Sequence, residues 1–143
     1  MKTEIRYYTR SKKGNTKKLA DAVSAATGIA AKDVSVDLDE KTDRLILINA
    51  MYAANIDEAV KAFLARNKSK IGQIVNMNTS ATGRSTIGAV KAAAQPLGIP
   101  VSDLEFHCAA SWIFLNQGKP TQEDLDRAGA FAASVAGGDD DAH

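Results

Sequence analysis

The chain has 143 residues, of which 45% are hydrophobic and 24% charged, as in an ordinary globular protein. This length predicts one domain with a proper core, and the formal net charge of +1 excludes a strong field toward nucleic acid or an acidic membrane surface. A single cysteine, Cys108, excludes an internal disulfide. The sequence has no apolar run of roughly 20 residues that would span a membrane, and residues 1–4 lack the apolar character of a signal peptide. We therefore expect a cytoplasmic protein.

The chain begins with a short strand and a long helix. Residues 3–9 are rich in strand formers, although Glu4 and Arg6 make this strand more polar than a fully buried one. Residues 15–27 have helical periodicity, and Gly28 is a natural stop for that helix. The apolar face of the helix is formed by Leu19, Ala22, Val23 and Ala26.

Two further strands and a second helix follow. Residues 33–38 alternate apolar and polar side chains, which predicts a half-exposed edge strand. Residues 45–48 are a continuous apolar run, typical of a parallel strand covered on both faces. After a loop over residues 49–54, a helix begins with Asp57 and Glu58 in its first turn, the sign expected where no anion binds. Its apolar face is formed by Ile56, Ala59, Val60, Phe63 and Leu64.

A fourth strand over residues 71–77 leads into a polar loop over residues 78–85. This loop has two interpretations that are compatible with each other. It can present backbone N–H groups to a ligand, or it can cap the next helix through Thr82 or Ser85. That third helix has Ile87, Val90, Ala94 and Leu97 on its apolar side and ends at Gly98 and Pro100.

The last strand and the last helix complete the domain. Residues 104–110 predict a fifth strand, followed by a loop over residues 111–119. Thr121 is predicted to be the N-cap of the last helix, because acidic residues follow it in the first turn. The sequence predicts one domain over residues 1–136 and a flexible acidic tail over residues 137–143. The last helix can turn Leu125, Ala128, Phe131, Ala132 and Val135 toward the core.

The order β-α-β-β-α-β-α-β-α predicts an α/β protein with a doubly wound, five-stranded parallel sheet between two helix layers. Ligands of such sheets bind at the carboxyl ends of the strands, near the point where the strand order reverses. The loops that we expect to meet there are residues 11–16, 49–55, 78–85 and 108–117.

The turn that opens the first helix is basic, which is the wrong sign for a helix start. Helix N-termini are partially positive and favour acids, yet this turn contains Arg10, Lys12, Lys13, Lys17 and Lys18 and no acid. A bound anion would account for these cations, which favours a phosphate-binding loop. The alternative is a solvated basic turn with Asn15 or Thr16 as an ordinary N-cap, and these residues alone leave both interpretations open.

The sequence here resembles that of the flavodoxin-like family, in its short-chain form, over nearly all of residues 1–136. The family loop Ser/Thr-x-Thr-Gly-x-Thr corresponds to Ser11-Lys12-Lys13-Gly14-Asn15-Thr16, with Lys13 in place of the middle hydroxyl residue. The stretches at residues 50–57 and 106–120 also resemble regions of small flavodoxin-like proteins. The resemblance implies the strand order 2-1-3-4-5 and flavin mononucleotide (FMN) as cofactor.

The resemblance also implies which residues hold FMN. The loop of residues 11–16 would bind the phosphate, and the loops after the third and fourth strands would bind the flavin ring. Tyr52 can stack on the ring or pack on its own loop. The implied cofactor-binding residues are Ser11, Lys12, Lys13, Gly14, Asn15, Thr16, Ala50, Met51, Tyr52, Asn55, Asn78, Thr79, Ser80 and Gly83.

The remaining reactive or aromatic side chains have ordinary explanations. Cys108 at a strand end is expected to be a buried, inert thiol, and alternation places His107 on the opposite side of the strand. Trp112 fits a structural or partner-contact role better than a place at the ring. We find no metal-ligand cluster, and one internal histidine does not support a catalytic triad, so no catalytic residue is predicted.

Three functions fit this sequence. The first is an FMN-binding electron-transfer protein that shuttles electrons between redox partner proteins, as a monomer or weak dimer. The second is a small FMN-dependent NAD(P)H or quinone-type reductase, which would need a substrate pocket over the ring. The third is a flavin-free subunit of a redox complex, which Lys13 and the polar first strand leave open. Members of the family are usually strongly acidic, so the near-neutral charge implies a partner other than the basic-faced reductases on which acidic carriers dock.

Overall fold

The computed structural model describes residues 1–10, 14–110 and 118–137. The predictions for Ser11, Lys12, Lys13, Trp112 and the tail after Gly137 lie outside these residues. Within them, no helix has both the length and the apolar character that crossing a membrane requires.

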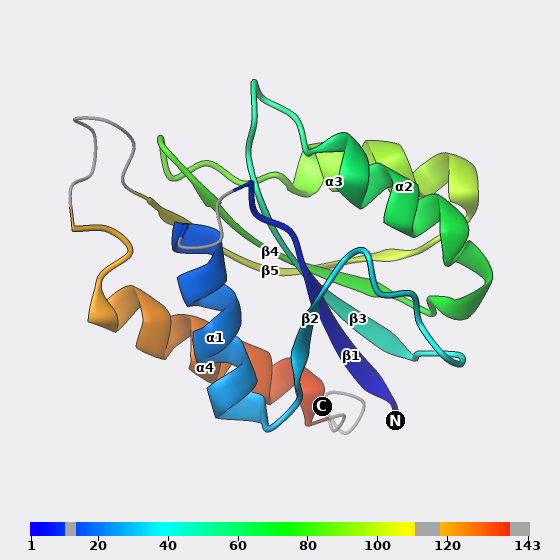
Figure 1. The fold of residues 1–143 in the computed structure, drawn as a ribbon, viewed down its shortest axis with the longest axis horizontal. Coiled ribbons are helices and arrows are strands. Elements are labelled where there is room, and N and C mark those ends of the chain that lie inside the picture. The colour runs from blue at the N-terminus through cyan, green and yellow to red at the C-terminus, as the bar shows by residue number, and fades with distance from the viewer. Residues whose placement is uncertain (11–13, 111–117, 138–143) are drawn as a thin grey trace.

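Five parallel strands form one sheet in the order β2-β1-β3-β4-β5, with α1 and α4 on one face and α2 and α3 on the other (Figure 1). This confirms the predicted three-layer architecture and strand order. The strands are β1 Thr3–Tyr7, β2 Ala31–Asp33, β3 Arg44–Ala50, β4 Ile74–Ser80 and β5 Val101–Ala109. The α-helices are α1 Asn15–Thr27, α2 Glu58–Arg66, α3 Ile87–Ala94 and α4 Gln122–Ala136, and the short 3₁₀ helices are η1 Lys68–Lys70 and η2 Gln95–Leu97.

Local sequence signals fixed several boundaries. Helix α1 has the predicted bounds and ends where Gly28 adopts a left-handed φ of 73°. Helix α4 begins with a complete capping box, in which Thr121 Oγ1 accepts from the Asp124 N–H and Asp124 Oδ2 accepts from the Thr121 N–H. Gly98, with a φ of 73°, ends η2 directly after α3, as predicted.

The second strand is an edge strand, as predicted, but its bounds were predicted wrongly, because it covers residues 31–33 rather than 33–38. The reason is the side chain of Arg6, which is only 2% exposed. Its Nε donates to Val36 O at 2.8 Å and its Nη2 donates to Asp37 O at 3.1 Å. The Arg6 side chain thus bonds to the two backbone carbonyls that would pair with a neighbouring strand if β2 continued to residue 38. Val34 and Leu38 are buried nonetheless. The alternation of apolar and polar residues that predicted a strand therefore reflects the burial of these side chains and not the extent of the strand.

Strand β4 covers residues 74–80 rather than 71–77, and β5 begins at Val101 rather than at residue 104. Asn78, Thr79 and Ser80 were assigned to a loop because they are polar, yet all three pair with β5, and Asn78 and Thr79 also pair with β3. Hydrogen bonds inside the protein allow these side chains to remain buried. The earlier start of β5 is accommodated by a register shift between Ile74 and Asn76 on β4.

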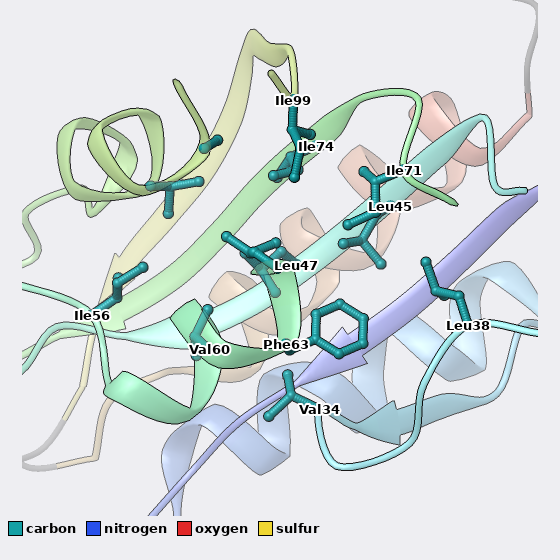
Figure 2. Packing of buried hydrophobic residues seen from close by; sticks show 13 residues of the cluster. Val34, Leu38, Leu45, Leu47, Ile56, Val60, Phe63, Ile71, Ile74 and Ile99 are labelled. Atoms are coloured by element: carbon teal, nitrogen blue, oxygen red, sulfur yellow. The ribbon is translucent and has the colours of Figure 1, made fainter. Parts of the chain in front are cut away.

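Two apolar clusters cover the two faces of the sheet. One cluster packs α2 and α3 on β3 and β4, with Phe63 beside Leu47 and Val60 (Figure 2). The other packs α1 and α4 on the opposite face, around Ile46 and Ile48. The continuous apolar run of β3 is therefore buried on both faces, as predicted.

We expect Gly129→Ala to destabilise the protein and Gly88→Ala to stabilise it slightly. A Cβ at Gly129 would lie 2.9 Å from Ala26 Cβ, where α4 crosses α1, whereas a Cβ at Gly88 on α3 meets nothing within 4 Å. Overpacking of this kind costs about 1–3 kcal/mol, which exceeds the gain of about 1 kcal/mol in helix propensity. Urea unfolding measures both variants, and equal stabilities would contradict the close approach of the two helices.

Candidate functional site

The carboxyl ends of the central strands open into a cleft of about 1030 Å³. The loops after β1, β3 and β4 line it, so the predicted convergence of these loops is confirmed. The volume lies at the upper end of the range for small-molecule sites, about 300–1,000 Å³. Its walls include nine of the residues implied by the resemblance: Gly14, Asn15, Thr16, Ala50, Met51, Tyr52, Asn55, Thr79 and Ser80.

The first wall is the start of helix α1. Gly14 is its N-cap, with extended backbone angles, and the helix has no side-chain cap and no acid in its first turn among the described residues. The alternative that Asn15 or Thr16 is an ordinary N-cap is therefore wrong. Thr16 is instead buried, and its Oγ1 lies 3.0 Å from Thr79 Oγ1 at the end of β4. By contrast, α2 has the expected acidic cap, since Asp57 accepts from the Ala59 N–H.

Two cations of the basic turn have carboxylate partners, one distant in sequence and one within the same helix. Arg10 Nε donates to Asp57 Oδ2 at 2.8 Å, across from the loop after β1 to the cap of α2. Lys17 Nζ donates to Asp21 Oδ1 at 2.6 Å, one turn further along α1. The described part of the cleft wall therefore contains two acids, Asp57 and Glu58, and both are paired with cations, Asp57 with Arg10 and Glu58 with Lys61. The start of α1 itself, which is described from Gly14 onward, has no acid in its first turn.

The second wall is the loop after β3, which contains a tight turn. Tyr52 and Asn55 exchange backbone hydrogen bonds of 2.7 and 2.9 Å across this turn. Ala53 and Ala54 have φ angles of 51° and 63°, the conformation of a type I′ turn. Tyr52 lines the cleft and also packs under the Arg10 guanidinium, which lies 3.8 Å from its ring centroid. Burial raises the pKa of the Tyr52 hydroxyl.

The third wall is the end of β4 with the loop that follows. Thr79, Ser80, Ala81 and Thr82 lie on the cleft, but Asn78 and Gly83 do not belong to its lining. Asn78 is fully buried, donating from Nδ2 to Arg84 O at 2.9 Å and accepting at Oδ1 from the Thr86 N–H at 3.0 Å.

The loop after β4 is also tied to its surroundings from two sides. His107 Nδ1 lies 2.7 Å from Gly83 O, and the Ser85 hydroxyl bonds to Glu105, so strand β5 holds the loop from outside. Ser85 Oγ also accepts from the Ile87 N–H at 3.0 Å. Ser85 thus supports the start of α3, but the N-cap is Thr86 and not Thr82 or Ser85, so the predicted cap residues were wrong.

A buried polar network beneath this wall was missed by the sequence analysis. Asn49 Nδ2 donates to Asn76 Oδ1 at 2.8 Å, and Asn76 Nδ2 donates to Thr86 Oγ1 at 3.0 Å. Thr86 Oγ1 in turn donates to Asn49 Oδ1 at 2.7 Å. The available signal was the pair Asn49 and Asn76, of which Asn49 follows the apolar run of β3 and Asn76 lies between Val75 and Met77.

Cys108 has the predicted character of a buried, inert thiol. Its side chain is buried at the end of β5, while neighbouring His107 is exposed on the other side of the strand. Burial raises the pKa of the Cys108 thiol to about 11, so the reactive thiolate is scarce at neutral pH.

The fold is that of the flavodoxins. A flavodoxin from the domain Archaea is 17% identical, with a TM-score of 0.69 over 96% of this chain and 98% of that one. A short-chain flavodoxin associated with a non-canonical PDU bacterial microcompartment is 16% identical, with a TM-score of 0.68 over 96% and 99%. A Fusobacterium nucleatum flavodoxin bound to flavin mononucleotide is 16% identical, with a TM-score of 0.64 over 94% and 97%. No family model and no curated protein matches the sequence.

Proposed function

We propose that this protein binds FMN in the cleft and carries electrons between redox partner proteins. The observation that carries the proposal is the start of α1, which opens on the cleft with a glycine cap, no acid and no side-chain cap among the described residues. A phosphate group would satisfy the helix N–H groups and complement the dipole. The fold shared with flavodoxins, including one bound to FMN, supports the same ligand.

The described residues fit both ends of this cofactor. Gly14 and Asn15 would hold the phosphate together with Ser11, Lys12 and Lys13 of the preceding sequence. Thr16 is tied to Thr79 and would connect this cradle to the ring site. The larger, apolar part of the ligand would lie between Met51 and Tyr52 on one wall and Thr79 and Ser80 on the other.

Electron transfer requires the protein to bind, orient and electrostatically tune the cofactor. Bound FMN supplies the electron-accepting and electron-donating chemistry, and the protein sets how strongly the reduced form is favoured. The described residues contain no group of three or more potential ligands for a metal ion.

The direct test is to titrate the protein, stripped of any ligand, with FMN. We expect saturation at one FMN per chain, quenched flavin fluorescence and a visible absorption band. Riboflavin, which lacks the phosphate, is expected to bind more weakly. A protein that binds neither flavin would overturn the proposal and favour the flavin-free subunit. Reduction of the bound flavin by NAD(P)H without a partner protein would instead support the small reductase.

We expect a less negative potential for full reduction of the bound FMN than in a strongly acidic flavodoxin. The chain has a net charge of +1 and a basic phosphate loop, so Coulomb interactions favour the extra electron. Photometric redox titration measures this potential, and a very low value would contradict the prediction. Lys18→Gln, in the first turn of α1, should lower the potential. Lys68→Gln should not, because Lys68 lies in η1, before the start of β4 and away from the cleft at the carboxyl ends of the strands.

The positive charges of the basic turn also affect which partner protein can dock near the cofactor. We propose that this partner presents a face that is not basic, because a basic face would be repelled by the turn, which contains Lys12, Lys13 and Lys18 besides the ion-paired Arg10 and Lys17. Electron transfer from the reduced protein to ferricyanide, an anion, should then slow as salt is added. Transfer to hexaammineruthenium(III), a cation, should become faster. The opposite salt dependence would contradict this partner chemistry.

A further inference from the structure

Arg10 joins two walls of the cleft. It follows β1 directly before the phosphate loop, and its side chain crosses to the loop after β3. There its guanidinium lies 3.8 Å from the Tyr52 ring centroid, and its Nε donates to Asp57 Oδ2 at 2.8 Å. Its backbone N–H also points at the Tyr52 hydroxyl, 3.4 Å away. Arg10 thus contacts the second wall at two residues that are five positions apart.

Those two residues flank a turn that is unfavourable for its sequence. Ala53 and Ala54 both have positive φ, which glycine or asparagine adopts far more easily than alanine. The turn is closed by backbone bonds between Tyr52 and Asn55 alone among the described contacts. A type I′ turn built from two alanines needs support from the rest of the protein.

Asp57 is well suited to anchor Arg10. Its Oδ1 accepts from the Ala59 N–H at 2.9 Å, so the carboxylate is fixed as the cap of α2 while Oδ2 faces Arg10. The hydrogen bond from Ala59, together with Arg10, lowers the pKa of the Asp57 carboxyl, so the ion pair persists at neutral pH. The Asp57 side chain is 14% exposed, against 58% for Arg10.

We propose that Arg10 is a positioning residue that clamps the turn and fixes the Tyr52 ring on the cleft wall, so that the site for the flavin ring is formed before the ligand arrives. The proposal rests on the proposed FMN function. A planar guanidinium stacks on the ring and bonds to the carboxylate at the same time, which a lysine ammonium does not do. Because its guanidinium is held by Asp57 and Tyr52, Arg10 acts on the ring end of the cofactor rather than on its phosphate.

The test compares FMN with riboflavin, which shares the ring and lacks the phosphate. Arg10→Ala is expected to weaken both by about tenfold, the size of one well-placed cation–π contact. Arg10→Lys is expected to recover only part of the loss. Asp57→Asn keeps the cap acceptor but breaks the ion pair, so its effect should overlap with that of Arg10→Ala instead of adding to it.

Arg66→Ala is the matched control. Arg66 also pairs with an aspartate, Asp37, at 3.0 Å, and lies 6.0 Å from an aromatic ring, that of Phe63, but it does not line the cleft. This variant should leave both flavin affinities unchanged. Arg10→Ala with normal riboflavin affinity would overturn the clamp, and a loss for FMN alone would assign Arg10 to the phosphate. Tighter riboflavin binding would show that Arg10 competes for the ring face.

Amide hydrogen exchange tests the clamp without any flavin. In the empty protein, Arg10→Ala should speed exchange of the Tyr52 and Asn55 amides severalfold, because these close the turn, while Arg66→Ala should not. Unchanged exchange at both amides would overturn the proposal. If the wild-type protein binds neither flavin but Arg10→Ala loosens the turn, the FMN function fails and the structural clamp stands.

Discussion

Replacing Gly14 with aspartate is expected to stabilise the empty protein and to abolish tight FMN binding. Gly14 is the N-cap of α1, and its φ of −75° and ψ of 169° suit any residue. An aspartate there supplies the missing acceptor and the negative charge that the helix dipole favours, each worth several tenths of a kcal/mol to about 1 kcal/mol. The same carboxylate stands where the phosphate dianion would bind, and repulsion of several kcal/mol lowers the affinity by about a hundredfold or more.

Gly14→Asn is the matched control for this experiment. Asparagine caps the helix as well as aspartate does but adds no charge, so it should stabilise the empty protein with a smaller loss of FMN affinity. Riboflavin affinity should change little in either variant, because riboflavin has no phosphate. Urea unfolding and fluorescence titration give the two quantities. An aspartate variant that still binds FMN tightly would contradict a phosphate site at α1.

The start of α1 lacks an acid that would stabilise the empty helix but would repel a phosphate group. This conflict is why the site could be identified from the sequence. The anomaly is local, since the cations and the single glycine lie within ten residues of the helix start. The bounds of α1 and the capping box at Thr121 and Asp124 are local as well. The continuous run of β3 predicted burial on both faces because period and composition decide that feature without any distant partner.

What the sequence did not predict depends on contacts between distant segments. Arg6 ends β2 by bonding to carbonyls that are 30 and 31 residues away. Arg10 and Asp57 are 47 residues apart, so the turn seemed to lack any acid. Polarity at Asn78 and Thr79 suggested a loop, because no local pattern shows that buried hydrogen bonds will keep these side chains in a strand.

The buried network under the third wall carries the largest effect on stability. We expect Asn76→Leu, which keeps the approximate volume, to cost about 3 kcal/mol, because the polar groups around it remain buried without partners. Asn76 is fully buried, and it accepts from Asn49 and donates to Thr86 and Asn78. Urea unfolding measures the loss, and Gln95→Leu, at an exposed amide in η2, should stay within about 0.5 kcal/mol of wild type.

The network also predicts which part of the cleft responds. Thr86 is the N-cap of α3, and Asn78 holds the loop through Arg84 O, so Asn76→Leu should loosen residues 81–85 before the rest of the sheet. Amide exchange of that loop should rise, while the α1 amides behind the phosphate cradle stay protected. Riboflavin affinity should therefore fall together with FMN affinity, whereas Gly14→Asp should lower the affinity for FMN alone. If only global unfolding changes, the network stabilises the core without positioning the third wall of the cleft.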